Sequence, residues 1–139
     1  MVYKSNVLVL ANRTAMSAGL EDVLQGRAER GPASFTLLVP LGLGPDAQLA
    51  AQAMASRLRE VGLDVDARAG DTDPLNAVLE AWSPGEFDEI IVSTLPASVS
   101  RWMQTGLPRR IERQTGALVR HVEARAAHAS ARRPLLVTR

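Results

Sequence analysis

The sequence predicts an α/β fold in which one five-stranded parallel sheet is doubly wound, with helices on both of its faces. Apolar runs of strand length alternate along the chain with segments whose apolar residues recur at helical spacing. The connections between these segments are short and marked by Gly and Pro. Right-handed crossovers then place the strands parallel in one sheet.

The first two strands are apolar runs that flank a helical pattern. Four consecutive apolar residues, Val7–Leu10, predict a strand buried on both faces. A helix is expected over residues 15–30, because Gly31 and Pro32 end a segment with apolar residues at helical spacing. The second strand is expected over Phe35–Val39, closed by a proline. The apolar positions of the first helix are Leu20, Val23, Leu24 and Ala28.

A longer helix is predicted to begin near Asp46 and to end at Gly62. The stretch Val65–Ala69 alternates polar and apolar residues, as expected of a strand at a sheet edge. The buried side of this longer helix is predicted to be Leu49, Ala50, Ala53, Met54, Leu58 and Val61.

The second half of the chain starts with a helix at Pro74, which suits the first helical position, with Asp73 as its cap. The fourth strand contains Ile90–Val92, a short helix is expected over 109–115, and a fifth strand over 118–122. We therefore expect one domain over residues 1–123, followed by a tail over 124–139. The buried side of the helix after Pro74 is predicted to be Leu75, Val78, Leu79 and Trp82.

Composition excludes several classes of protein. The chain has 139 residues and no cysteine, which excludes disulfides, thiolate chemistry and cysteine zinc sites. No apolar run approaches the roughly 18 residues of a membrane span. The opening residues, MVYKSNVLVLANRT, are expected to be a first strand and not a signal peptide, because no small-residue cleavage site follows the apolar run. We expect a cytoplasmic protein without a membrane partner.

Charge is divided unevenly along the chain. Residues 1–100 carry a net charge of −6. Residues 101–139 carry a net charge of +7, from nine arginines and two glutamates. Such asymmetry indicates either an anionic partner or two halves that attract each other when they fold. We expect the second. Nucleic acid is not expected as a partner, because the basic half lacks interleaved aromatic residues and any recognisable nucleic-acid motif.

Polar residues follow the fourth strand, and the loops after the strands of a parallel sheet are where ligands usually bind. Hydroxyl residues are concentrated there beside Arg101, and such a group is able to hold an anion. The alternative is that one serine caps a turn and Arg101 pairs with a surface carboxylate. The hydroxyl residues are Ser93, Thr94, Ser98 and Ser100.

Acidic and histidine residues do not form a recognisable catalytic or metal motif. Asp64, Asp66, Asp71 and Asp73 are expected to be a solvated edge and a helix cap, because a hard cation requires about six converging oxygens. His121 has no triad partner at a G-x-S-x-G elbow, so we expect it to be packed or at an interface.

The order of elements, the Gly70–Asp71 loop with Pro74 before an Ala-rich helix, and the strand Asp88–Val92 running into a loop resemble the universal stress protein family. The resemblance covers about residues 5–122. It implies strand order 3-2-1-4-5 and dimers formed through the last strand. The expected homodimer contacts are Leu118, Val119, Arg120, His121 and Val122.

Members of this family that bind ATP carry the signature G-x2-G-x9-G-(S/T), which falls here on Ser93, Pro96, Gly106 and Leu107. Only Gly106 matches. Proline has no amide hydrogen and leucine no hydroxyl, so two groups that would hold phosphate are missing. The family's Asp followed by Gly-Ser after the first strand is replaced by Asn12-Arg13-Thr14.

The resemblance and the substitutions together lead to three functional hypotheses. The first is a non-catalytic stress-response protein whose nucleotide site is degenerate, so that ATP or another nucleotide is not an assured ligand. The second is a sensor that binds a nucleotide or another small anion at the loop after the fourth strand. The third is a phosphoanhydride hydrolase, for which neither a base nor a metal site is evident. The candidate ligand-binding residues are Asn12, Thr14, Gly70, Asp71, Ser93, Thr94, Ser98, Ser100, Arg101 and Gly106.

Overall fold

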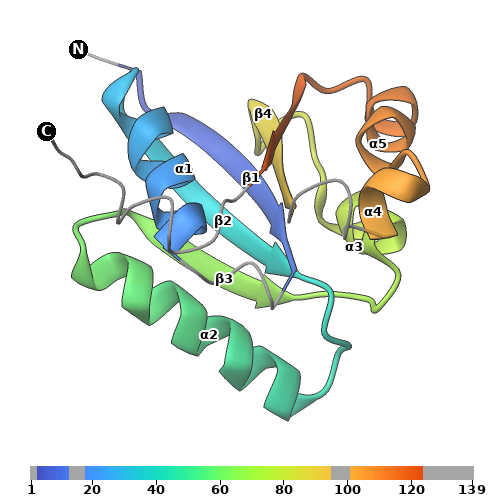
Figure 1. The fold of residues 1–139 in the computed structure, drawn as a ribbon, viewed down its shortest axis with the longest axis horizontal. Coiled ribbons are helices and arrows are strands. Elements are labelled where there is room, and N and C mark those ends of the chain that lie inside the picture. Colours follow the sequence, from blue (N-terminus) through green and yellow to red (C-terminus); the bar gives the residue numbers. More distant parts are fainter. Residues whose placement is uncertain (1–2, 13–17, 95–100, 124–139) are drawn as a thin grey trace, which may run out of the picture.

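The computed structural model describes residues 3–12, 18–94 and 101–123. Its strands form one parallel five-stranded sheet in the order β3-β2-β1-β4-β5 (Figure 1), which confirms the predicted fold class and strand order. The strands are β1 (Ser5–Ala11), β2 (Ala33–Val39), β3 (Val65–Ala69), β4 (Glu89–Thr94) and β5 (Val119–Glu123). The helices are α1 (Ala18–Glu29), α2 (Pro45–Glu60), α3 (Pro74–Ala81), α4 (Arg101–Gln104) and α5 (Leu107–Thr115).

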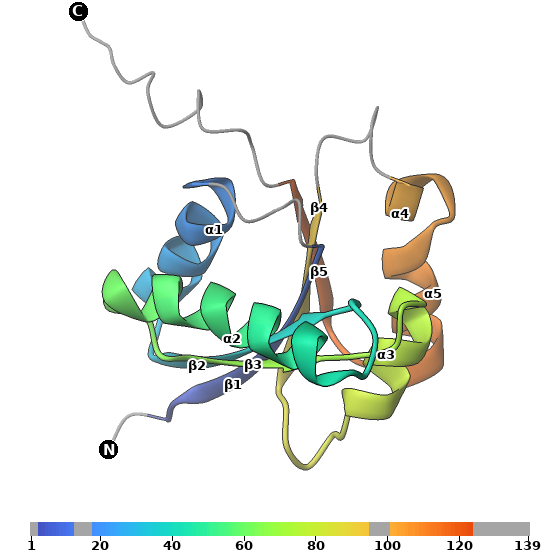
Figure 2. The ribbon, with the colours of Figure 1, turned by 90° about the horizontal axis from the view of Figure 1, so that it is seen from below.

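The sheet lies between two helical layers, with α1 and α2 on one face and α3, α4 and α5 on the other (Figure 2). Alternate residues of each strand point to opposite layers. In β1, Val7 and Val9 join the core beneath α1 and α2, whereas Leu8 and Leu10 join the core beneath α3 and α5. All four are fully buried, as predicted for a strand covered on both faces.

The buried side of α2 differs from the prediction. Its buried residues are Ala51, Met54, Ala55 and Leu58, whereas Leu49 is 68% exposed and Val61 40% exposed. Met54 and Leu58 are thus buried as predicted and Ala50 is half-buried, whereas the predicted burial of Leu49, Ala53 and Val61 is wrong. Two stripes fit helical spacing in this alanine-rich helix, and the stripe that faces the sheet is the one whose alanines allow close packing.

The remaining helix boundaries follow local chemistry. Leu75 donates its backbone N–H to the Asp73 carboxylate over 3.1 Å, which confirms the predicted cap of α3. In α3 the buried residues are Ala77 and Val78, and Leu79 is 40% exposed, so its predicted burial is wrong. The helix α5 begins at Leu107, two residues before the predicted start, and ends at Thr115, where Gly116 with φ of +70° caps it.

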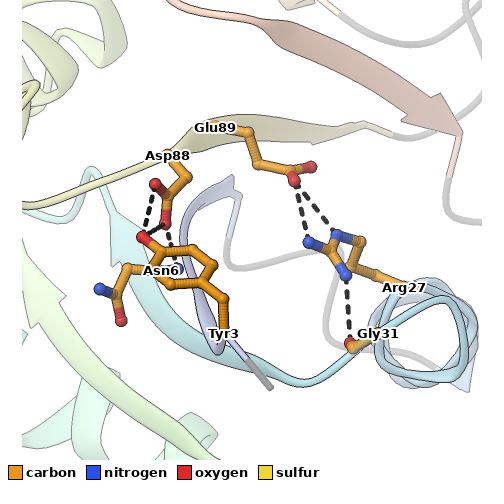
Figure 3. Close-up of polar contacts among 6 residues, drawn as sticks. All are labelled: Tyr3, Asn6, Arg27, Gly31, Asp88 and Glu89. Atoms are coloured by element: carbon orange, nitrogen blue, oxygen red, sulfur yellow. Dashed lines mark hydrogen bonds and ion pairs between the residues drawn. The ribbon is translucent and has the colours of Figure 1, made fainter. Parts of the chain in front are cut away.

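Two carboxylates at the start of β4 join segments that are distant in sequence (Figure 3). Tyr3 donates its hydroxyl to both oxygens of Asp88, over 2.8 and 2.9 Å, and the Asn6 backbone N–H donates to the same carboxylate over 2.7 Å. Glu89 accepts hydrogen bonds from the Arg27 guanidinium over 3.0 and 3.2 Å. These contacts hold the entry to β1 and the helix α1 against β4.

The Asp88 contacts predict acid-dependent stability. The Asn6 N–H and then the Tyr3 hydroxyl hold the pKa of Asp88 below its ordinary value. The stabilising contribution is therefore complete above the unfolded pKa of about 3.9 and is lost as pH falls through the lower folded pKa. Urea unfolding of Asp88→Asn is expected to show a deficit against the wild type at pH 7 that shrinks at pH 3.

The matched control for this prediction is Asp22→Asn on α1, an exposed carboxylate with no side-chain hydrogen bond within the described part of the chain. It is expected to change stability at pH 7 by less than about 0.5 kcal/mol. A deficit of Asp88→Asn that grows on acidification would contradict the assignment.

Within the described ranges, no helix is both long and apolar enough to cross a bilayer.

Candidate functional site

The strand order reverses between β1 and β4, which is the position where open α/β sheets bind ligands beyond the carboxyl ends of their strands. Register places Ala11 beside Ser93, so Asn12 follows next to Thr94. We call this place the switch point and define it by Ala11, Asn12, Ser93 and Thr94. The structure thus brings Asn12 together with both described hydroxyl residues predicted for the site.

Ser93 is the residue of the switch point that the protein leaves unsatisfied. Its side chain is fully buried, and its hydroxyl has no hydrogen-bond partner in the part of the chain that the structure describes. Strand alternation places it on the same face as Ile91, beneath α1. A buried polar group without a partner costs roughly 1–3 kcal/mol, which makes Ser93 a position where an external partner would be stabilising.

Thr94 points to the opposite face and is satisfied within the protein. Its hydroxyl lies 2.7 Å from Nε2 of His121 on the neighbouring strand β5. Because Thr94 is only 1% exposed and its hydroxyl is already hydrogen-bonded, this hydroxyl is not available to a ligand. It also orients the imidazole of His121, which the sequence analysis assigned only to packing or an interface.

Gly70 and Asp71 follow β3, which is separated from β1 by β2, so the structure does not bring them to the switch point. A Cβ on Gly70 would lie 3.0 Å from both Ala77 Cβ and Leu38 Cδ1, so tight packing accounts for this glycine. The Asp71 carboxylate accepts the Asp73 N–H over 2.8 Å and shapes the turn before α3.

A small cavity of about 170 Å³ borders Gly70. Ligand pockets usually measure roughly 300–1,000 Å³, so this cavity is too small for a nucleotide. The interpretation of Gly70 and Asp71 as structural residues is therefore preferred over their predicted ligand role.

Of the signature positions around α5, Gly106 also lines a pocket between α5 and β5, whereas Leu107 lies in the core. Gly106 precedes α5 with φ of +67°, a left-handed conformation that favours glycine. Leu107, which stands where the signature has a hydroxyl, is 1% exposed and belongs to the core beneath α3 and α5. Arg101 is exposed at the start of α4. The predicted site residues Thr14, Ser98 and Ser100, and the signature position Pro96, lie outside the described residues.

Acidic residues near β3 are engaged in ion pairs. Asp64 pairs with Lys4 and Asp66 with Arg59. The Lys4 contact, supported by Ser34, lowers the pKa of Asp64. Across residues 3–12, 18–94 and 101–123, no group of three or more His, Cys, Asp or Glu residues converges as a metal site would require.

Comparison with known proteins gives a structural match. No protein-family profile matches the sequence, and no curated protein sequence matches it. A solved structure described as a universal stress protein in complex with cAMP is similar, with a TM-score of 0.62 and 17% sequence identity. The match covers 89% of this chain and 99% of that one. The chain has the fold of a universal stress protein.

The fold likeness confirms the architecture that the resemblance implied. It extends over nearly the whole of the matched chain, so the five strands and the helices that cover them form a complete version of this fold. At 17% identity it does not transfer residue roles, and the chemistry of the site has to come from this chain's own side chains.

One group of candidate site residues was not predicted from the sequence. Arginines of α5 and His121 of β5 line a common pocket on the α5 face of the sheet. From the sequence these arginines are only part of a charged segment. The net charge of +7 over residues 101–139 was the one feature of the sequence that could have indicated them.

Proposed function

We propose that this chain is a non-catalytic, stress-response-type binding protein that holds a nucleotide with a single phosphate at the switch point. The observation that carries the proposal is the buried Ser93 hydroxyl, which lacks a partner in the described part of the chain at the place where this fold class binds ligands. The similar stress protein was solved with cAMP, a nucleotide of this class.

The preference for a single phosphate follows from the phosphate-binding groups of the signature that this sequence lacks. A triphosphate requires several backbone amides and hydroxyls that approach closely. Pro96 has no amide hydrogen, and Leu107 is committed to the core. A single phosphate requires fewer donors, and Ser93 with Asn12 supplies polar groups at the switch point.

The experiment is a ligand titration of the wild type and of Ser93→Ala with cAMP and AMP, followed by calorimetry and by thermal unfolding. The wild type is expected to bind and to be stabilised by about 2.7 kcal/mol at a ligand concentration 100 times the Kd. Ser93→Ala is expected to bind about tenfold more weakly, because it removes one hydrogen bond to a charged group. The matched control is Ser56→Ala, an exposed serine of α2, which should bind as the wild type does.

Without ligand, Ser93→Ala is expected to be as stable as the wild type or more stable by up to about 1 kcal/mol, since it removes an unsatisfied polar group. A loss of stability above about 1 kcal/mol would show that Ser93 has a partner within the protein. The proposal is contradicted if neither nucleotide binds, or if Ser93→Ala binds them unchanged.

Catalysis is not part of this proposal. A hydrolase requires a positioned base or metal, and the described residues of the switch point comprise an amide, two hydroxyls and an alanine. Turnover of ATP or cAMP by the pure protein would revive the hydrolase alternative.

Homodimerisation through residues 118–122 remains a proposal that rests on the resemblance. The position of β5 at the sheet edge supports it, because one side of that strand is unpaired in the described structure. Leu118, directly before β5, is 67% exposed. Light scattering that gives the mass of a monomer would contradict it.

A further inference from the structure

A pocket of about 500 Å³ lies between α5 and β5, on the sheet face opposite the Ser93 side chain. We call it the α5–β5 pocket. Its volume falls within the usual range for small-molecule sites. The residues that determine its charge and shape are Arg109, Arg110, Arg113, Glu112, Val119 and His121.

The arginines of this pocket are not neutralised by the acidic half of the chain. The ion pairs found in the described structure, Lys4–Asp64, Arg27–Glu89, Arg59–Asp66 and Arg68–Glu86, all lie within residues 4–89. None of the three pocket arginines has a carboxylate or a side-chain hydrogen bond among the described residues. The expectation that the two halves neutralise each other therefore finds no support at α5.

The arrangement of these arginines is unfavourable for the isolated helix. Arg113 lies four residues after Arg109 and three after Arg110, and like charges at these spacings on a helix repel each other. Arg109 and Arg110 also lie in the first turn, where the helix dipole favours negative charge and where α5 has no acidic residue. Glu112 is the one carboxylate among the lining residues, and it pairs with none of them.

His121 lines the pocket from β5, and its ring is hydrogen-bonded. Its Nε2 is held by the Thr94 hydroxyl at 2.7 Å, and the ring lies on the strand that faces α5. The pocket thus combines a rigid β-strand wall with a helical wall of three free guanidinium groups. Such groups bind phosphate oxygens in a bidentate way.

We propose that the α5–β5 pocket binds a small molecule that carries two or more phosphate groups. Three arginines among the lining residues carry more positive charge than a single phosphate needs, and a volume of about 500 Å³ lies within the range of small-molecule sites. The pocket lies on the sheet face opposite the Ser93 side chain and takes its arginines from α5, so the proposal stands whether or not a nucleotide binds near Ser93.

Inorganic tripolyphosphate is the probe, because it carries the proposed chemistry and no base. Calorimetry of the whole chain is expected to show one site per chain, binding that weakens as salt rises, and weaker binding of orthophosphate. Arg109→Gln/Arg113→Gln is expected to lower the affinity for tripolyphosphate by roughly tenfold or more. The matched control is Arg30→Gln/Arg57→Gln, which removes the same charge from two exposed arginines without ion pairs in the described structure and should bind as the wild type does.

The α5 variant should unfold at a temperature no lower than the wild type, because it removes repulsion between like charges. Equal loss of affinity in the two double variants would overturn the proposal, since it would reveal a nonspecific charge effect. Absence of tripolyphosphate binding would also overturn it. A hexaglutamate peptide that binds more tightly than tripolyphosphate, through Arg109 and Arg113, would overturn it as well, because the pocket would then bind an acidic protein.

The two sites are distinguished by crossing the variants. Ser93→Ala is expected to weaken cAMP and to leave tripolyphosphate unchanged, whereas the α5 variant should do the reverse. The affinities of ATP and AMP are compared in the α5 variant, in which Arg109 and Arg113 no longer contribute to binding. In this variant ATP is expected to bind no more tightly than AMP.

Discussion

Glu89→Ala is expected to lower the free energy of unfolding by about 3–5 kcal/mol, because it leaves the Arg27 guanidinium buried without its partner. The side chains of Arg27 and Glu89 are only 10% and 13% exposed, and the pair is 3.0 Å apart. The remaining hydrogen bond from Arg27, to the Gly31 carbonyl over 3.3 Å, does not neutralise the charge. Urea unfolding at neutral pH measures the loss as a lower midpoint.

An exposed ion pair of the same length provides the control. Arg68 and Glu86 are also 3.0 Å apart, but their side chains are 44% and 50% exposed. Glu86→Ala is therefore expected to cost at most about 1 kcal/mol. Equal losses in the two variants would show that Arg27 regains water when Glu89 is removed, and the buried pair would then not be what fastens α1 to β4.

Leu58→Ala is expected to lower the free energy of unfolding by about 2–5 kcal/mol, because it opens a cavity in the core beneath α1 and α2. Leu58 is 3% exposed and belongs to that core. The same substitution at Leu49, on the same helix but 68% exposed, is expected to change stability by less than about 0.5 kcal/mol.

This pair of variants separates the two possible orientations of α2, since the residue type, the helix and the substitution are the same. If Leu49→Ala is as destabilising as Leu58→Ala, the helix packs through the predicted stripe, which contains both residues, and the observed orientation is wrong. The measurement is again urea unfolding, and similar m-values in both variants would confirm that the extent of unfolding is unchanged.

The two proposed sites share one structural link. Thr94 belongs to the switch point, and its hydroxyl is bonded to His121, which lines the α5–β5 pocket. The neighbouring residue Ser93 points to the other face of the sheet. The side chains of these two adjacent residues of β4 therefore face different helical layers, because successive side chains of a strand alternate between faces.

Much of the architecture could be predicted from local patterns. Apolar runs such as Val7–Leu10, breaks such as Gly31–Pro32 and the Asp73 cap identify strands and helices through the chemistry of a few neighbouring residues. Strand order followed from the resemblance, and the structure confirms it. The position of Asn12, Ser93 and Thr94 at the carboxyl edge of the sheet also followed, because strand ends in a parallel sheet meet at one side.

Other features depend on contacts between distant residues and have no local signal. Spacing allowed two buried stripes in α2, and packing against the sheet selected the one with Ala51 and Ala55. Arg27 meets Glu89 across 62 residues. Sequence alone identifies a basic carboxyl-terminal segment and a lost phosphate signature. The unsatisfied Ser93 hydroxyl, and the pocket that the α5 arginines share with His121, arise only when the chain is folded, because burial and proximity are properties of the packed molecule.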